Sequence, residues 1–201
     1  LEARFPFGEY AQQALLDSAY AYYKTDEPET AIATLDRFMR VYPLNENIDY
    51  AMYLRGLINF NRDMGILEKY IPRDETQRDP GSALQALRDF TTLVNRFPTS
   101  RYSDDAAQRV VYLRNRLAQH ELHVASYYMR RASYLAAANR AKYVIENYPR
   151  TPAMPDALVV MAKAYKILEL NYLSEDALRV LEANYPGHPG VAEVRKTTLV
   201  D

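Results

Sequence analysis

The sequence contains no cysteine and no tryptophan among its 201 residues, and it has only 6 glycines. The absence of cysteine excludes disulfides and thiolate metal sites. The net charge of −1 gives no reason to expect nucleic acid as a partner. No run of residues approaches the roughly 18 apolar residues of a membrane-spanning helix. With 48% hydrophobic and 25% charged residues, the composition is that of a folded protein.

The motifs of common catalytic sites are missing as well. There is no glycine-rich phosphate loop, no cysteine nucleophile and no Gly-x-Ser-x-Gly turn. His120 and His123 share a helical face, but zinc-dependent proteases space their histidines differently and add a further ligand. A metal hydrolase built on these two histidines is the enzyme alternative. We predict instead that both are surface or packing residues, with no catalytic residue, no metal and no cofactor.

An aromatic residue stands directly before proline five times along the chain. Successive prolines of these pairs are 37, 55, 51 and 37 residues apart, and the shortest step is near the 34 residues of a tetratricopeptide repeat. Such repeats form helical solenoids that present long surfaces to partners. This spacing therefore favours a binding scaffold. The pairs are Phe5-Pro6, Tyr42-Pro43, Phe97-Pro98, Tyr148-Pro149 and Tyr185-Pro186.

Small residues recur in register with these prolines. The positions thirteen residues after the first four prolines, and twelve before the next, are mostly alanine, glycine or serine. Small side chains let two helices of a hairpin approach closely. The forward set is Ala19, Gly56, Val111 and Ala162, and the backward set is Ala31, Ala86, Ala137 and Ser174.

Amphipathic stretches between turn residues predict the helices. Pro28 suits the start of a helix, with Asp26 or Glu27 near its cap, and Asp79 is a good N-cap. We expect one long helix from Ser103 to about Arg131, or two nearly continuous ones. The other predicted helices cover 9–24, 28–41, 47–61, 80–96, 135–148, 155–170 and 174–184, with a short capping helix at 191–201.

The predicted fold class is all-α, a tetratricopeptide-repeat superhelical solenoid of antiparallel helix hairpins that forms a single domain over residues 1–201. The long segment at 62–78 is either functional or disordered, and we expect an interaction loop. The predicted divisions are the tail of a truncated repeat (1–6), a repeat (7–43), a repeat with the insertion 62–78 (44–98), a repeat with a long first helix (99–149), a repeat (150–186) and a C-terminal cap (187–201).

Several segments resemble the BamD family of outer-membrane assembly lipoproteins, also called ComL-like. The similarity runs from Leu1 to about Pro186 and includes both long repeats. The segments that carry it are Arg4-Phe5-Pro6-Phe7-Gly8-Glu9-Tyr10, Tyr20-Ala21-Tyr22-Tyr23-Lys24, Asp36-Arg37-Phe38, Asn47-Ile48-Asp49-Tyr50, Tyr53-Leu54-Arg55-Gly56-Leu57 and Arg78-Asp79-Pro80.

The resemblance implies a non-enzymatic subunit of the machinery that inserts β-barrel proteins into the outer membrane. Its implied partners are the membrane-proximal POTRA domain of BamA, other assembly lipoproteins and unfolded outer-membrane β-barrel precursors. Its implied location is the periplasmic face of the outer membrane, held by a lipid anchor outside this chain. A generic tetratricopeptide adaptor or co-chaperone that binds peptide C-termini is the alternative.

Tyrosine is abundant, with 18 residues, and several tyrosines fall where first helices line the concave face of a solenoid. Exposed apolar patches mark binding sites, and tyrosine suits extended peptides with aromatic side chains. We predict a groove for the aromatic-ended C-terminal signal of barrel precursors, unless a preceding repeat or curvature covers it. The groove residues are Gln13, Leu16, Tyr20, Tyr23, Lys24, Tyr50, Tyr53, Leu57 and Phe60.

Residues 99–145 carry eight lysines and arginines against three acidic residues. Such a block is either a solvated face or a surface for an acidic partner, for which arginine is well suited. The resemblance places a contact with BamA at Asn139 and Arg140, and we predict that Arg140 meets a carboxylate there. Arg130 and Arg131 complete the predicted site.

Overall fold

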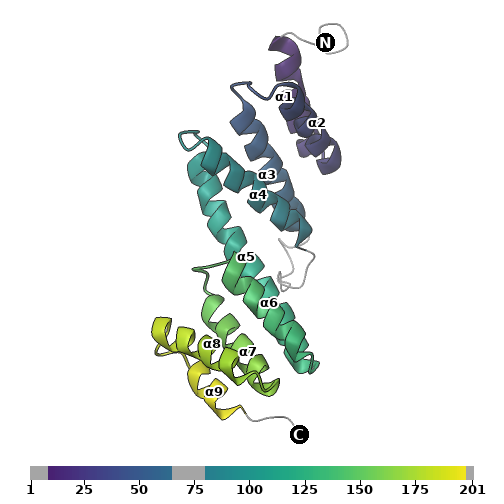
Figure 1. Ribbon diagram of the computed structural model, residues 1–201. Helices are drawn as coiled ribbons and strands as arrows, with labels where there is room; N and C mark the ends of the chain where they lie inside the picture. Colours follow the sequence, from purple (N-terminus) through teal and green to yellow (C-terminus); the bar gives the residue numbers. More distant parts are fainter. Residues whose placement is uncertain (1–8, 65–79, 198–201) are drawn as a thin grey trace. The chain divides into compact units, whose positions relative to one another are not determined.

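The computed structural model describes residues 9–64 and 80–197, and within these ranges every regular element is an α-helix, which confirms the all-α class. None of the described helices combines the length and the apolar character needed to cross a membrane. In chain order they are α1 (Glu9–Lys24), α2 (Pro28–Val41), α3 (Ile48–Met64), α4 (Gly81–Arg96), α5 (Ser103–Arg130), α6 (Tyr134–Asn147), α7 (Met154–Ile167), α8 (Asn171–Asn184) and α9 (Gly190–Lys196) (Figure 1).

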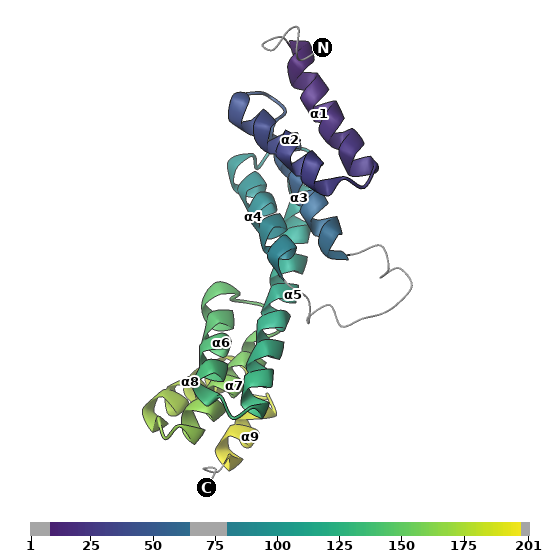
Figure 2. The same cartoon turned by 90° about the vertical axis from the view of Figure 1, so that its right-hand side faces the viewer.

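The chain divides into two compact units, and α5 runs through both of them. Unit 1 contains α1 to α4 and the start of α5 as far as Leu113, and unit 2 contains the rest of α5 and α6 to α9. In unit 1, α1 pairs with α2 and α3 pairs with α4, and α2 also packs on α3 (Figure 2). That the residues 1–201 form one solenoid with the predicted repeat divisions stays a prediction.

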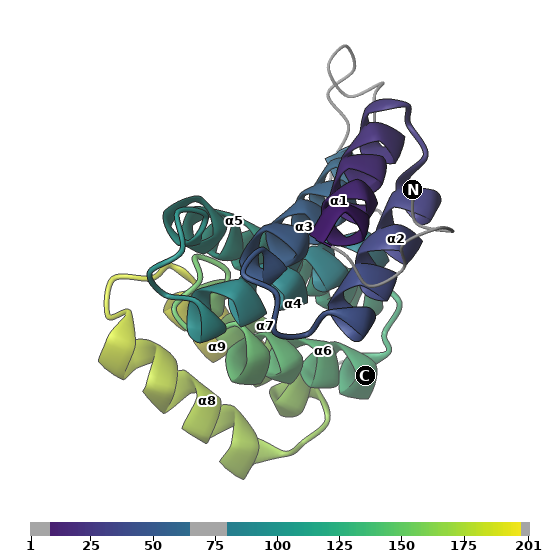
Figure 3. The same cartoon turned by 90° about the horizontal axis from the view of Figure 1, so that it is seen from above.

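Unit 2 continues the same pairing with a shorter terminal helix. Its helix α7 packs between α6 and α8, and α9 closes against α7 and α8 (Figure 3). The largest side chains of this core are fully buried, among them Leu158, Leu181 and Val194. The predicted capping helix is thus present, although it ends at Lys196.

Helices cross where the sequence places its small residues. Ala19 and Ala31 of the first hairpin are 0% exposed. The same is true of Ala86, Ala137 and Ala162 in the later hairpins. In the last hairpin the hydroxyl of Ser174 donates to the backbone oxygen of Ala162 at 2.9 Å, which joins the two helices at their crossing. All four residues of the backward set are buried, as predicted.

The forward set is wrong at one position. Val111 is 60% exposed, whereas Ala125, fourteen residues later on α5, is fully buried. Ala125 precedes Ala137 by twelve residues, the same separation as Ala19 from Ala31. The extra length of this repeat therefore lies before the crossing, so counting from the preceding proline selects a position nearly four turns too early.

The turns inside three hairpins share a left-handed backbone conformation that the sequence does not predict. Asp26, Ala132 and Glu169 have φ values of 63°, 56° and 61°, in the left-handed region that glycine usually occupies. Each is followed by a residue whose N–H bonds back to the carbonyl of a tyrosine five residues earlier. The turn before Pro28 was predicted from Asp26, Glu27 and Pro28, but because none of the three residues is glycine, the left-handed conformation was not.

Apart from the end of the capping helix, helix boundaries agree with the prediction to within three residues. The long helix is a single helix, and Pro28 does begin α2, although Glu27 caps it without a side-chain hydrogen bond. The early turn at Glu169 ends α7 at Ile167 and lets α8 begin at Asn171. The predicted N-cap Asp79 and most of the predicted interaction loop 62–78 lie outside the described residues.

Gly56→Ala tests the close crossing of α3 and α4. A Cβ atom at position 56 would lie 2.6 Å from Cε1 of Phe90, and that ring is fully buried. We expect the free energy of unfolding to fall by about 2 kcal/mol, because the ring has no room to move. Urea denaturation measures this loss. Gly187→Ala is the matched control, since no atom lies within 4 Å of its added carbon, and equal stability of both variants would contradict the crossing.

Candidate functional site

The predicted groove residues lie on α1 and α3, the first helices of the two hairpins of unit 1. On α1, Gln13 donates a hydrogen bond to Asp17 at 2.8 Å, and the rings of Tyr20 and Tyr23 lie 6.4 Å apart. The ammonium group of Lys24 lies 5.5 and 5.8 Å from these two ring centroids. Tyr20 remains 45% exposed. This face of α1 therefore offers aromatic surface together with one cation.

Leu16 does not belong to the solvent-facing set. It is 2% exposed and lies in the buried stripe that also contains Leu15 and Ala19. Leu16 is three residues from both Gln13 and Ala19 and four from Tyr20, so helical spacing alone does not decide which way it faces, and its burial places it with the core. The expectation that its side chain faces solvent is wrong.

The predicted groove residues of α3 pack against the chain that follows α4. Tyr53 stacks on Tyr102 with ring centroids 4.7 Å apart, and its hydroxyl donates to Asp105 at 2.7 Å. The ring of Phe60 lies 5.7 Å from that of Tyr112. These contacts give the aromatic residues of α3 a folding role that the sequence analysis did not assign to them. All four residues are partly exposed: Tyr50, Tyr53, Leu57 and Phe60.

The start of α5 also packs against the predicted groove residues of α3, which the sequence did not predict. Nε of Arg109 donates to Asp105 at 2.6 Å, and its guanidinium lies 4.8 Å from the ring centroid of Phe60. The hydrogen bond from Arg109 lowers the pKa of Asp105, against the opposing effect of burial. The spacing of the two residues, i and i+4 on a helix, was the available signal. The side chain of Arg109 thus interacts with Asp105 and Phe60 within unit 1, although the sequence analysis counted it among the basic residues of 99–145.

The tyrosines of the groove are close enough to affect one another's ionisation. Burial raises the pKa of Tyr50, and Tyr102 and then Tyr20 raise it further. Burial also raises the pKa of Tyr53 to about 12, helped by its hydrogen bond to Asp105. Both phenols are therefore neutral hydrogen-bonding groups at physiological pH. Helix α1 also contacts α3 directly.

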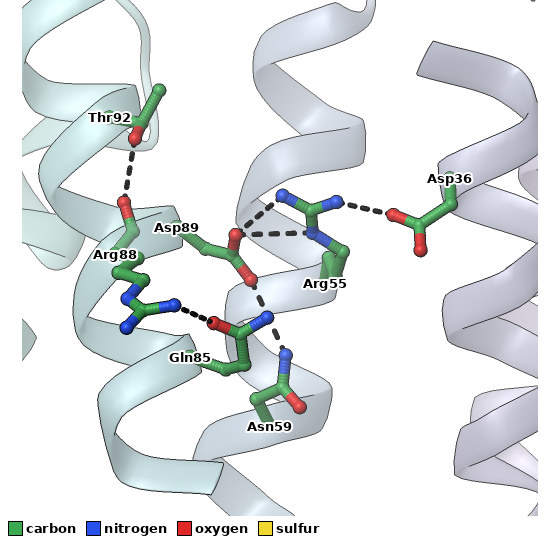
Figure 4. Close-up of polar contacts among 7 residues, drawn as sticks. All are labelled: Asp36, Arg55, Asn59, Gln85, Arg88, Asp89 and Thr92. Atoms are coloured by element: carbon green, nitrogen blue, oxygen red, sulfur yellow. Dashed lines mark hydrogen bonds and ion pairs between the residues drawn. The ribbon is translucent and has the colours of Figure 1, made fainter. Parts of the chain in front are cut away.

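Beneath this groove, Arg55 of α3 joins three helices of unit 1 (Figure 4). Its guanidinium donates to Oδ1 of Asp89 on α4, at 2.6 Å from Nη2 and 3.1 Å from Nε, and also bonds to Asp36 on α2. Asn59 donates to the second oxygen of Asp89 at 3.4 Å. A single side chain on α3 thus fixes the helix relative to its own partner and to the preceding hairpin.

The network of Arg55, Asp36 and Asp89 adds little net stability, but it fixes the relative positions of the helices. Burial raises the pKa of Asp89, although the hydrogen bonds from Arg55 lower it. A carboxyl whose pKa is raised in the folded protein makes stability fall as the pH rises above the ordinary aspartate range. Buried ion pairs of this kind recover little more than the cost of removing their charges from water. The network is therefore better understood as fixing the relative positions of α2, α3 and α4.

Two cavities open at opposite ends of α1. One, of about 870 Å³, lies between the first half of α1 and the turn from α2 to α3, and includes Tyr10, Gln13 and Asn45. The other, of about 470 Å³, lies where α1 ends, α2 begins and α3 ends, and includes Tyr23 and Lys24. The aromatic face of α1 runs between them, so a ligand of extended shape has room at both ends.

The predicted partner residues all lie in unit 2 and are exposed. Arg130 and Arg131 stand at the end of α5, and Asn139 and Arg140 stand on α6. Arg140 donates to Glu121 of α5 at 3.0 Å, and their side chains are 46% and 12% exposed. Arg140 thus already has an internal carboxylate, which the sequence analysis did not find because the two residues are 19 positions apart.

The remaining basic residues of the block are divided between the two units. Arg101 and Arg109 belong to unit 1, Arg114 donates to the backbone oxygen of Pro149, and Lys142 pairs with Glu146 within α6. Across residues 9–64 and 80–197, no group of three or more histidine, cysteine, aspartate or glutamate side chains is arranged to hold a metal ion.

Comparison with known proteins identifies relatives over nearly the whole chain. The family YfiO, described as an outer membrane lipoprotein, matches residues 1–181. The chain is 47% identical over 189 residues to the outer membrane protein assembly factor BamD of Neisseria meningitidis serogroup B, covering 94% of this chain and 71% of that protein. The BamD of Xylella fastidiosa (strain Temecula1) is 43% identical, with 94% and 64% covered. The BamD of Vibrio cholerae is 37% identical over 184 residues, with 92% and 76% covered.

Within the Arg55 network, the charges of Arg55 and Asp89 are expected to contribute differently to stability, and single substitutions distinguish them. Arg55→Met leaves Asp89 buried without its cation, and we expect it to lower the free energy of unfolding by about 3 kcal/mol. Asp89→Asn removes the charge that burial penalises and leaves Arg55 paired with Asp36, so we expect a smaller loss, about 1 kcal/mol. Urea denaturation of both variants gives the comparison. A larger loss for Asp89→Asn than for Arg55→Met would contradict this description of the network.

Proposed function

This chain belongs to the YfiO family of outer membrane lipoproteins, which includes the BamD factors of outer membrane protein assembly, and we propose that it is a non-enzymatic scaffold and substrate-recognition subunit of that machinery. In this role it binds BamA and unfolded barrel precursors. The observation that carries the proposal is the aromatic face of α1, where Tyr20 stays largely exposed beside Tyr23 and Lys24.

The groove of unit 1 supports the binding of an extended peptide. Tyrosine combines a large apolar ring with a hydroxyl, so it contacts apolar side chains while it remains wettable when the site is empty. The α3 tyrosines are held by Tyr102 and Asp105, so this side of the groove is rigid. A preorganised wall loses little conformational entropy when a peptide binds.

The aromatic-ended C-terminal signal of barrel precursors is the proposed ligand. Aromatic pairs gain about 0.5–1.5 kcal/mol beyond the burial of their area. Tyr20 and Tyr23 offer two rings tilted by 57° to each other, an arrangement that can receive a third ring. The remaining wall, at Phe60 and Tyr112, is aromatic as well.

For BamA we propose the outer face of α6 in unit 2, centred on Arg140. Asn139 is exposed beside it, and Leu135 and Tyr143 on the same helix are 59% and 41% exposed. Glu121 receives a hydrogen bond from Nη1 of Arg140, and the guanidinium remains accessible for an acidic group of the membrane-proximal POTRA domain. Arg130 and Arg131 extend the cationic surface at the end of α5.

The location and further partners follow from the family. We propose that the protein acts at the periplasmic face of the outer membrane through a lipid anchor outside this chain, beside other assembly lipoproteins. The supporting observations are the family's description as an outer membrane lipoprotein and the names of the BamD relatives.

Tyr20→Ala tests the peptide groove. We expect about tenfold weaker binding of a fluorescent peptide that ends in phenylalanine, because the variant removes an exposed ring from the centre of the face. Fluorescence anisotropy provides the affinity. Tyr172→Ala is the matched control, since Tyr172 is 76% exposed on α8 of unit 2. If both variants bind as the wild type does, the groove is not the peptide site.

A charge swap tests whether Arg140 meets the partner or serves only the fold. We expect Arg140→Glu to weaken binding of the membrane-proximal POTRA domain by about a hundredfold, because the external carboxylate loses its cation. Adding Glu121→Lys restores the internal ion pair, and with it the melting temperature, but not the binding. Calorimetric titration and thermal denaturation measure the two effects separately.

The control for the charge swap is Lys142→Glu, which makes the same charge reversal on the same helix at a residue that is 55% exposed. Binding that returns in the swapped pair would mean that Arg140 acts only through Glu121. Equal losses for Lys142→Glu and Arg140→Glu would point to net charge and would also refute the assignment.

A further inference from the structure

The smaller cavity of unit 1 has a composition unlike the rest of the groove. It lies at the end of α1, where the chain turns into α2 and the end of α3 approaches, and has a volume of about 470 Å³. Its floor is apolar, since Ile58 is 1% exposed. The lining residues are Tyr23, Lys24, Asp26, Pro28, Ile58, Asn61 and Arg62.

Lys24 is the unusual residue of this cavity. Its ammonium group lies above the rings of Tyr20 and Tyr23, at 5.5 and 5.8 Å from their centroids. Within the described ranges it has no carboxylate at ion-pair distance, whereas Arg62 beside it pairs with Glu29 at 2.7 Å. A cation held over two aromatic rings without a carboxylate is ready to receive an anionic group.

The neighbouring groups also favour an anion. Asn61 donates its amide to the hydroxyl of Tyr23, which fixes both side chains at the rim. Helix α2 begins at Pro28, and its N-cap residue Glu27 makes no side-chain hydrogen bond to the first turn. The first turn of α2 thus has no side-chain cap, and its first residue, Pro28, lines the cavity. The opposing charge in the lining is Asp26, which is exposed in the turn.

On the premise of the proposed function, we infer that this cavity binds the C-terminal carboxylate of the precursor peptide and that Lys24 is the residue that pairs with it. The last aromatic side chain of the peptide then lies against Tyr20 and Tyr23, which flank the ammonium group. The rest of the peptide runs along α1 towards Gln13 and the larger cavity. Capture of a terminal carboxylate by a cation and backbone N–H groups is a recurrent mode of peptide recognition.

The test compares two peptides on two proteins. The peptides share one sequence that ends in phenylalanine and differ only in a free or amidated C-terminus. The proteins are the wild-type chain and Lys24→Gln, which keeps a polar side chain one atom shorter than that of lysine and removes its charge. We expect amidation to weaken binding to the wild type about tenfold. Lys24→Gln should bind the free acid as weakly as the amide, with no further effect of amidation.

Each other outcome overturns the inference. An amidation effect of the same size in Lys24→Gln would mean that another group binds the carboxylate. No amidation effect in the wild type, with binding that Tyr20→Ala weakens, would refute the carboxylate site and leave the groove in place. No binding of either peptide would refute the groove as well. Lys142→Gln on α6 is the control for loss of a lysine charge elsewhere, and it should bind both peptides as the wild type does.

Discussion

The close crossing of two helices at a pair of small residues is the constraint on which the rest of the structure depends. Ala19 and Ala31 allow it in the first hairpin, and Ala162 and Ser174 allow it in the last, where a hydrogen bond joins the crossing. Between α3 and α4 the contact is made by Gly56 against the ring of Phe90. Because the crossing orients each first helix, it also determines which of its side chains face the core and which face a ligand.

In unit 1 this geometry divides the aromatic residues between packing and binding. The tyrosines of α3 contact the start of α5, and Arg55 holds α3 between Asp36 and Asp89. On α1, the hydroxyl of Tyr23 accepts a hydrogen bond from Asn61, whereas Tyr20 is 45% exposed. We propose that these two surfaces form one groove, because together they suit a peptide that arrives unfolded and must be recognised by its side chains.

Much of the fold follows from local signals. Prolines and turn residues place the helices to within a few positions, and the small residues before each closing proline identify the buried crossing. The position Val111 failed because a count along the chain cannot tell on which side of a crossing extra residues are inserted. The left-handed conformation of Asp26, Ala132 and Glu169 was not predicted, because none of these residues is the glycine that usually marks it.

The candidate site was predicted less completely, for a physical reason. Helical periodicity indicates which residues leave the core, and it selected Tyr20, Tyr23 and Lys24 correctly as an exposed face. It does not indicate which exposed residues will meet another helix. The pairing of Tyr53 with Asp105 and that of Arg140 with Glu121 both depend on contacts between separate helices, which no local pattern contains.

We propose that substrate and assembly partner bind different units, with peptide on the α1–α3 face of unit 1 and partner on α6 of unit 2. Hydrogen–deuterium exchange with and without a saturating phenylalanine-ended peptide is the first measurement to make. We expect slower exchange in α1 and α3 and unchanged exchange in α6. Protection that appears in α6, or that is absent from α1, would contradict it.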